Sequence, residues 1–139
     1  MMLLEQREKA VSLTALSATQ LAAGIREGRF SAVEVVEAHI RRIETVDGDL
    51  NAVVIPLFDE ARREASLADD ALERGDPLGP LHGVPITIKE QYRIAGTQTT
   101  LGATNKIGNV YHDEGPLVTK LREAGAIILG KTNIVQTLA

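Results

Sequence analysis

The stretch Gly79-Pro80-Leu81-His82-Gly83-Val84-Pro85-Ile86-Thr87-Ile88-Lys89-Glu90 says more about the fold than any other part of this 139-residue sequence. Its first residues, rich in proline and glycine, are typical of a connection without regular structure. From Val84 onward apolar and polar residues alternate, so Val84, Ile86 and Ile88 share one face and predict a strand buried on one side. Lys89 ends this strand, just before a loop rich in threonine and glycine.

Helices and a short strand are expected on the N-terminal side of this stretch. Ser17 and Ser31 each have a Gln or Glu three residues later, which is the capping-box pattern of a helix start. The expected helices cover residues 18–27, 32–47 and 59–73, with a buried strand over residues 51–56. We expect the charged residues of the third helix to form a solvated face with local ion pairs.

On the C-terminal side, a threonine-rich loop is expected between Gly96 and Gly102. A helix is expected over residues 116–124 and a second buried strand over residues 126–129, and Asn133 could cap a last helix. Helices that alternate with short apolar strands indicate an α/β fold.

Composition excludes several classes of function. The chain has 15 Lys and Arg against 19 Asp and Glu, a formal net charge of −4, and only two tyrosines and two phenylalanines. This argues against a nucleic-acid partner, which needs basic side chains for phosphates or aromatic rings for bases. The absence of cysteine excludes disulfides, thiolate zinc sites and a cysteine nucleophile.

Neither a membrane segment nor a bound metal is expected. The longest apolar stretches, residues 52–58 and 124–129, are far shorter than the ~20 residues of a spanning helix. The N-terminus turns charged at Glu5, without the apolar core of a secretory signal, so we expect a cytoplasmic protein. His39, His82 and His112 are scattered over different elements, which predicts no metal site and no cofactor.

Residues 125–132, GAIILGKT, match the phosphate-loop pattern G-x-x-x-x-G-K-T. In a true phosphate loop a strand precedes the first glycine, and the variable residues curl around the phosphates. Here a helix is expected before Gly125, and the variable residues are an apolar run typical of a buried strand. We therefore do not expect nucleotide binding, which nucleotide-dependent thermal stabilisation would reveal.

Lys89 is the one residue whose position suggests chemistry. From the pattern alone, the favoured interpretation is that it is the last residue of an amphipathic strand and points to water. An exposed lysine with a pKa near 10.4 is neutral in only about one molecule in 2,500 at neutral pH. To act as a base, Lys89 must be desolvated so that its pKa falls by about 3 units.

Residues 79–90 resemble the catalytic-lysine motif of the amidase signature family. The resemblance continues through residues 95–102 (AGTQTTLG) and through residues 117–133 (LVTKLREAGAIILGKTN). The helical stretch SAVEVVEAHIRRIE at residues 31–44 is similar to the usual start of these enzymes. The likeness extends over about residues 14–139, and three motifs in the same order make it specific.

This resemblance implies a hydrolase of carbon–nitrogen bonds with a Ser–cis-Ser–Lys triad and a small-molecule amide as substrate. Lys89 matches the family's lysine, the ultimate base, while one serine relays the proton and another attacks the carbonyl. The implied fold is the N-terminal portion of a large mixed sheet covered by helices, which would desolvate Lys89. No cofactor or metal, no membrane and no nucleic acid are implied.

The sequence departs from the family in its serines. Both triad serines of the family lie beyond the GKTN element, and this sequence ends six residues after Asn133. Its serines, which all precede Lys89, are Ser12, Ser17, Ser31 and Ser66. We therefore expect a tail over residues 1–13 and a truncated N-terminal part of an amidase domain over residues 14–139, inactive alone. A truncated domain with unpaired sheet edges should aggregate readily and bind hydrophobic dyes.

One alternative is a non-catalytic interaction module, a subunit that needs a partner chain carrying the serines. Such a module should be soluble and unfold cooperatively, unlike a truncated domain.

Overall fold

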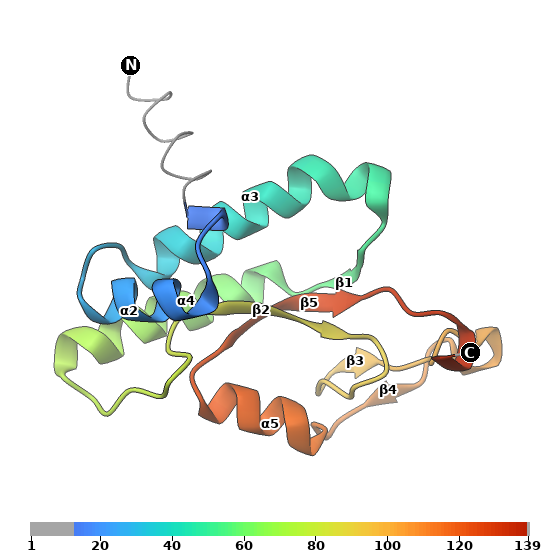
Figure 1. The fold of residues 1–139 in the computed structure, drawn as a ribbon. Helices are drawn as coiled ribbons and strands as arrows, with labels where there is room; N and C mark the ends of the chain where they lie inside the picture. Colours follow the sequence, from blue (N-terminus) through green and yellow to red (C-terminus); the bar gives the residue numbers. More distant parts are fainter. Residues whose placement is uncertain (1–12, 139) are drawn as a thin grey trace.

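A three-stranded mixed sheet lies at the centre of the computed structural model, which describes residues 13–138 (Figure 1). Its order is β1 (Val53–Pro56), β5 (Ile127–Thr132) and β2 (Pro85–Lys89). The last strand of the chain is therefore the central one, antiparallel to β1 and parallel to β2. The expected α/β class and mixed sheet are confirmed.

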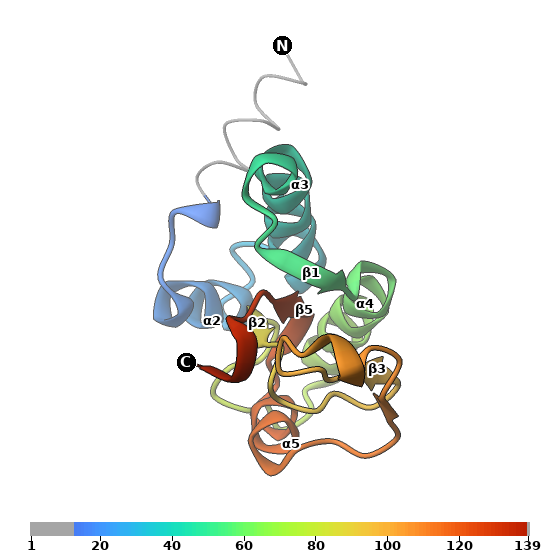
Figure 2. The ribbon, with the colours of Figure 1, turned by 90° about the vertical axis from the view of Figure 1, so that its right-hand side faces the viewer.

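Helices cover both faces of the sheet. On one face lie α2 (Ala18–Arg26), α3 (Ala32–Leu50) and α4 (Phe58–Arg74), and on the other lie α5 (Pro116–Glu123) and the hairpin β3–β4 (Figures 1 and 2). The hairpin pairs Thr97–Gln98 with Val110–Tyr111, so part of the expected threonine-rich loop is a short strand.

Each layer has its own apolar cluster. The larger one, under α2–α4, includes Ile25, Val36 and Ile40, which have no exposed surface. The smaller one, under α5, includes Val118 and Ile128. Of the tail expected at residues 1–13, only Leu13 is among the described residues, and it packs in the larger cluster. No helix within residues 13–138 is long and apolar enough to cross a membrane.

The helix starts follow the sequence closely, but one helix end does not. Ser17 and Ser31 form the predicted capping boxes of α2 and α3. The end predicted for α3 at Asp47-Gly48 is wrong, because the helix continues to Leu50 and ends at Asn51 in the left-handed conformation (φ 50°). The Asp47 carboxylate accepts hydrogen bonds from the backbone N–H groups of the residues after Asn51, which fixes the exit there.

The C-terminal region differs from the prediction in two places. Gly130, expected at the exit of the last strand, lies inside β5, which continues to Thr132. The apolar residues before it are buried in this strand and do not form a phosphate loop. The helix expected after Asn133 is a short 3-10 turn at Gln136–Leu138, and the Asn133 side-chain oxygen accepts from the N–H of Ile134, the next residue.

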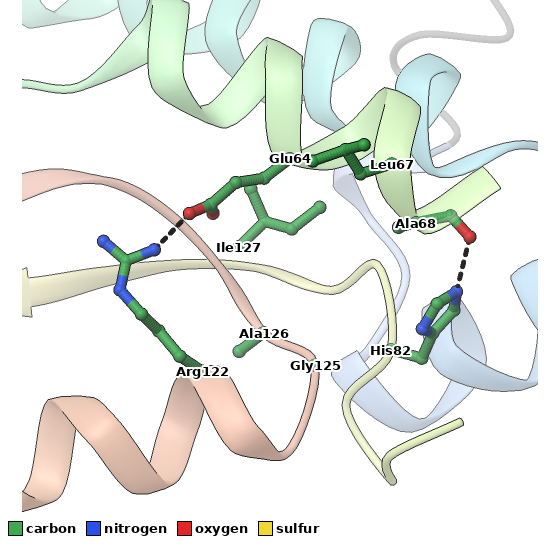
Figure 3. Close-up of a pocket in the computed structure, with 8 residues that line it drawn as sticks. All are labelled: Glu64, Leu67, Ala68, His82, Arg122, Gly125, Ala126 and Ile127. Atoms are coloured by element: carbon green, nitrogen blue, oxygen red, sulfur yellow. Dashed lines mark hydrogen bonds and ion pairs between the residues drawn. The ribbon is translucent and has the colours of Figure 1, made fainter. Parts of the chain in front are cut away.

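Acidic residues of α4 connect this helix to distant elements and are not merely a solvated face. Arg122 of α5 donates to Glu60 at 3.1 Å and to Glu114 at 2.9 Å. It also donates to Glu64 (Figure 3). Burial raises the pKa of Glu64, although the nearby Arg122 charge opposes this shift. Asp69 accepts hydrogen bonds from the backbone N–H groups of the first two residues of α3. The expected local pairing is present between Arg62 and Asp59 at 3.3 Å, but the same helix is also bound to distant elements.

The close approach of β1 to Gly130 predicts the effect of a single methyl group. A Cβ on Gly130 would lie 2.6 Å from the carbonyl oxygen of Ile55 and 2.8 Å from Val53 Cγ1, so β1 would have to shift. We expect Gly130→Ala to lower the free energy of unfolding by about 1–3 kcal/mol, measured by urea denaturation. The matched control is Gly48→Ala in α3, where nothing lies within 4 Å. The control should raise this free energy by about 0.5–1 kcal/mol. Unchanged stability of Gly130→Ala would contradict the pairing of β1 with β5.

The Arg122 network predicts a second stability difference. Arg122→Met leaves three neighbouring carboxylates without their shared cation, so we expect the free energy of unfolding near neutral pH to fall by about 2 kcal/mol. The loss should shrink as the pH falls, because burial raises the pKa of Glu64 and protonation removes the charge that Arg122 no longer balances. Arg62→Met is the control, because the Arg62 side chain is 40% exposed beside Glu37. It should cost less than about 1 kcal/mol. Equal losses in both variants would contradict a bridging role for Arg122.

Candidate active site

Lys89 lies at the carboxyl end of β2, next to the carboxyl end of β5, where it pairs in register with Thr132. Its backbone is held on both sides, since its carbonyl accepts from the N–H of Tyr92 and the N–H of Glu90 donates to Thr132. Its side chain is exposed, while that of the preceding Ile88 is buried on the opposite face. Within residues 13–138 the Lys89 amine has no hydrogen-bond or ion-pair partner. The described residues hold its backbone but do not bury its amine.

A second lysine at the same end of the sheet was not predicted from the sequence as a site residue. Lys131 in β5 is fully buried, and its Nζ donates to the carbonyl of Gln98 at 2.6 Å and to Thr99 Oγ1 at 2.8 Å. Thr97 Oγ1 lies 3.4 Å from the same nitrogen. Burial lowers the pKa of Lys131, and the negative charge of Glu90 acts in the opposite direction.

Glu90, the residue after Lys89, is also buried and holds the next part of the same loop. Its carboxylate accepts from the backbone N–H of Thr100, from Thr100 Oγ1 at 2.8 Å and from the N–H of Leu101 at 3.0 Å. Leu101 has a left-handed backbone (φ 55°), a conformation that non-glycine residues adopt rarely. Lys131 and Glu90 shared one signal in the sequence. Each is a charged residue soon after an apolar run, and the threonine-rich loop offers hydroxyl groups as their partners.

The structure also contains a pocket at the other end of the strands. It has a volume of about 250 Å³ and lies between α4 and α5, where Ala126 precedes β5 and Ile127 begins it (Figure 3). His82, 8% exposed, is bonded through Nε2 to the carbonyl of Ala68 at 2.9 Å. In open α/β sheets, ligands bind beyond the carboxyl ends of the strands. We therefore place the candidate site at the Lys89 end rather than at this pocket.

The other candidate residues are not gathered around Lys89. His39 is half-buried on α3, His82 lines the pocket and His112 is exposed after β4. The described part of the chain contains no cluster of His, Asp and Glu that could hold a metal ion. Ser17 and Ser31 cap helices and Ser66 is exposed on α4, while Ser12 lies outside the described residues.

Known proteins resemble this chain in both sequence and structure. The family model of amidases matches residues 34–139. Indoleacetamide hydrolase of Bradyrhizobium diazoefficiens is 45% identical over 117 residues, which are 84% of this chain and 22% of that protein. One subunit of the glutamyl-tRNA(Gln) amidotransferase of Streptomyces avermitilis is 37% identical, over 89% of this chain and 25% of that protein. The solved structure of a fatty acid amide hydrolase matches with a TM-score of 0.88 and 34% identity, over 94% of this chain and 23% of that one.

These matches agree with one another and with the motifs. The chain spans about a quarter of the length of its relatives, and the matched region contains the β2–β5 pair and Lys89. The family model covers well over half of the chain, and the resemblance noted in the sequence is confirmed by relatives and by structure. This chain belongs to the amidase family, the enzymes that carry the amidase signature.

Proposed function

We propose that this chain supplies the catalytic lysine, Lys89, for the hydrolysis of an amide carbon–nitrogen bond. The observation that carries the proposal is the position of Lys89 in the amidase region, at the carboxyl end of a strand with its backbone fixed and its amine unpaired among the described residues. Such a side chain is available to groups outside residues 13–138. The substrate is a small-molecule amide, and the location is cytoplasmic.

The proposed chemistry follows the Ser–cis-Ser–Lys scheme. The neutral amine of Lys89 takes a proton from the relay serine, which takes the proton of the second serine as its oxygen attacks the amide carbonyl. Backbone N–H groups stabilise the oxyanion, and the proton then passes to the departing amine. Water then hydrolyses the acyl-serine ester, which releases the acid and regenerates the serine hydroxyl. Only the neutral amine can accept a proton, and burial favours that form. The proposal therefore requires that further protein cover the exposed end of β2.

The two serines have to come from outside the described residues. Ser17 and Ser31 are occupied as helix caps, and Ser66 is on the solvent side of α4. They lie in a further segment of the protein or, as an alternative, in a partner chain, with this chain as a subunit. The second arrangement gains some support from the likeness to one subunit of an amidotransferase. Relatives named for such different substrates match the same stretch, so the match by itself does not name the substrate.

The 139-residue chain alone is expected to hydrolyse no amide, because it holds one member of the proposed triad. The measurement is ammonia release from indoleacetamide and from simple aliphatic amides, with the Lys89→Ala chain as the blank. Hydrolysis by the unmodified chain that disappears in Lys89→Ala would contradict this expectation and point to a nucleophile within the chain.

The role of Lys89 can be tested in a chimera. The 117 matched residues of this chain replace their counterparts in the Bradyrhizobium indoleacetamide hydrolase, at 45% identity. If the chimera hydrolyses indoleacetamide, Lys89→Ala should lower kcat/KM by about 10³-fold or more, because the nucleophile loses its base. Lys120→Ala, which removes an exposed lysine of α5, is the matched control and should leave kcat/KM unchanged. A Lys89→Ala chimera that keeps its activity would refute the proposed role.

A further inference from the structure

Two buried charged residues from neighbouring strands hold one and the same loop. Lys131 in β5 donates to Gln98 and Thr99, and Glu90 at the end of β2 accepts from Thr100 and Leu101. Residues 97–101, which we call the threonine loop, are thus fixed along their whole length. No other lysine, arginine, aspartate or glutamate within residues 13–138 is buried.

The charge of Lys131 is not explained by packing. Burying an ammonium group is unfavourable unless nearby acceptors replace the lost water, and an apolar side chain of similar volume fills the same space without that cost. Here three oxygen atoms of the threonine loop surround Nζ, and Glu90 provides the opposite charge nearby. These contacts give the loop one defined conformation, which an apolar residue at this position would not select.

The same contacts bear on Lys89 through the backbone. Glu90 follows Lys89 directly, and Lys131 precedes Thr132, the register partner of Lys89. If the threonine loop moved away, the Glu90 carboxylate would lose its hydrogen-bond partners. The end of β2 would then lose one of the contacts that hold it. The direction of the Lys89 side chain depends on that strand end.

We propose that Lys131 is a positioning residue for Lys89: together with Glu90 it fixes the threonine loop against the ends of β2 and β5 and so orients the Lys89 amine. The role of Lys89 as a base rests on the function proposed above, whereas the fixation of the loop does not.

The test compares Lys131→Met with Lys120→Met in the 139-residue chain, by amide hydrogen exchange and NMR. Methionine keeps the volume of lysine but not its charge. In the unmodified protein the N–H groups of Thr100 and Leu101 should be protected to a degree similar to that of Ile127, which donates to Val84 within the sheet. In Lys131→Met, exchange at Thr99–Leu101 should become about tenfold faster or more while Ile127 is unaffected. The ε-methylene signals of Lys89 should shift and broaden at the same time. Lys120→Met should change none of these signals.

A second variant separates positioning from packing. If Lys131 and Glu90 act as one unit, Glu90→Gln should also raise the exchange rates of the Thr99–Leu101 amides. In the double variant these rates should be at most about twofold higher than in the faster-exchanging single variant. Loop exchange and Lys89 signals that stay unchanged in Lys131→Met would overturn the proposal.

Two results in the unmodified chain would also overturn it: a freely exchanging threonine loop beside a protected sheet, or free exchange throughout, since the buried network would then not exist. None of these measurements depends on amide hydrolysis. A Lys89→Ala chimera that keeps its activity would refute the proposed function, whereas unchanged exchange in Lys131→Met would refute the role of Lys131, so the two failures are distinguishable.

Discussion

The structure depends on the insertion of β5 between two strands that come much earlier in the chain. β1 and β2 do not pair with each other, and both reach the sheet only through β5. Ile127 and Leu129 of β5 pack under α2–α4, while Ile128 packs under α5, so the same strand contributes to both apolar clusters. Without β5, neither layer would have a sheet to cover. The pairing that places Lys89 beside Thr132 is thus the pairing that holds the two layers together.

Features set by neighbouring residues could be predicted from the sequence. The capping boxes at Ser17 and Ser31 and the alternation that ends at Lys89 all depend on residues a few positions apart. The family resemblance added the mixed sheet and the candidate lysine. The motif at residues 79–90 therefore located one side of the candidate site, although the role of Lys89 stays a prediction.

Features set by distant residues could not be predicted. Lys131 reaches oxygen atoms 32 to 34 positions earlier, and Arg122 reaches carboxylates 58 and 62 positions earlier. Read locally, Lys131 is part of a misleading phosphate-loop pattern and Arg122 is an ordinary helix residue. The end of α3 was missed for a different reason, because Asp-Gly is typical of a helix end, whereas the Asp47 carboxylate binds backbone N–H groups five and six positions later, beyond Asn51.

The irregularity at Gly130 explains why the two lysines differ. Strict alternation after Ile127 and Leu129 would place Lys131 on the same face as those residues, toward α2–α4. The register shifts here, since Ile86 pairs with Ile128 but Thr87 pairs with Gly130, so Leu129 is an extra residue. One extra residue reverses the faces that follow it and aligns Lys131 with Ile88, on the side of α5 and the threonine loop. Lys89, one position later in β2, faces the other way and stays exposed. A single bulge thus buries Lys131 among hydroxyl and carbonyl groups, on the face opposite to that of the exposed Lys89.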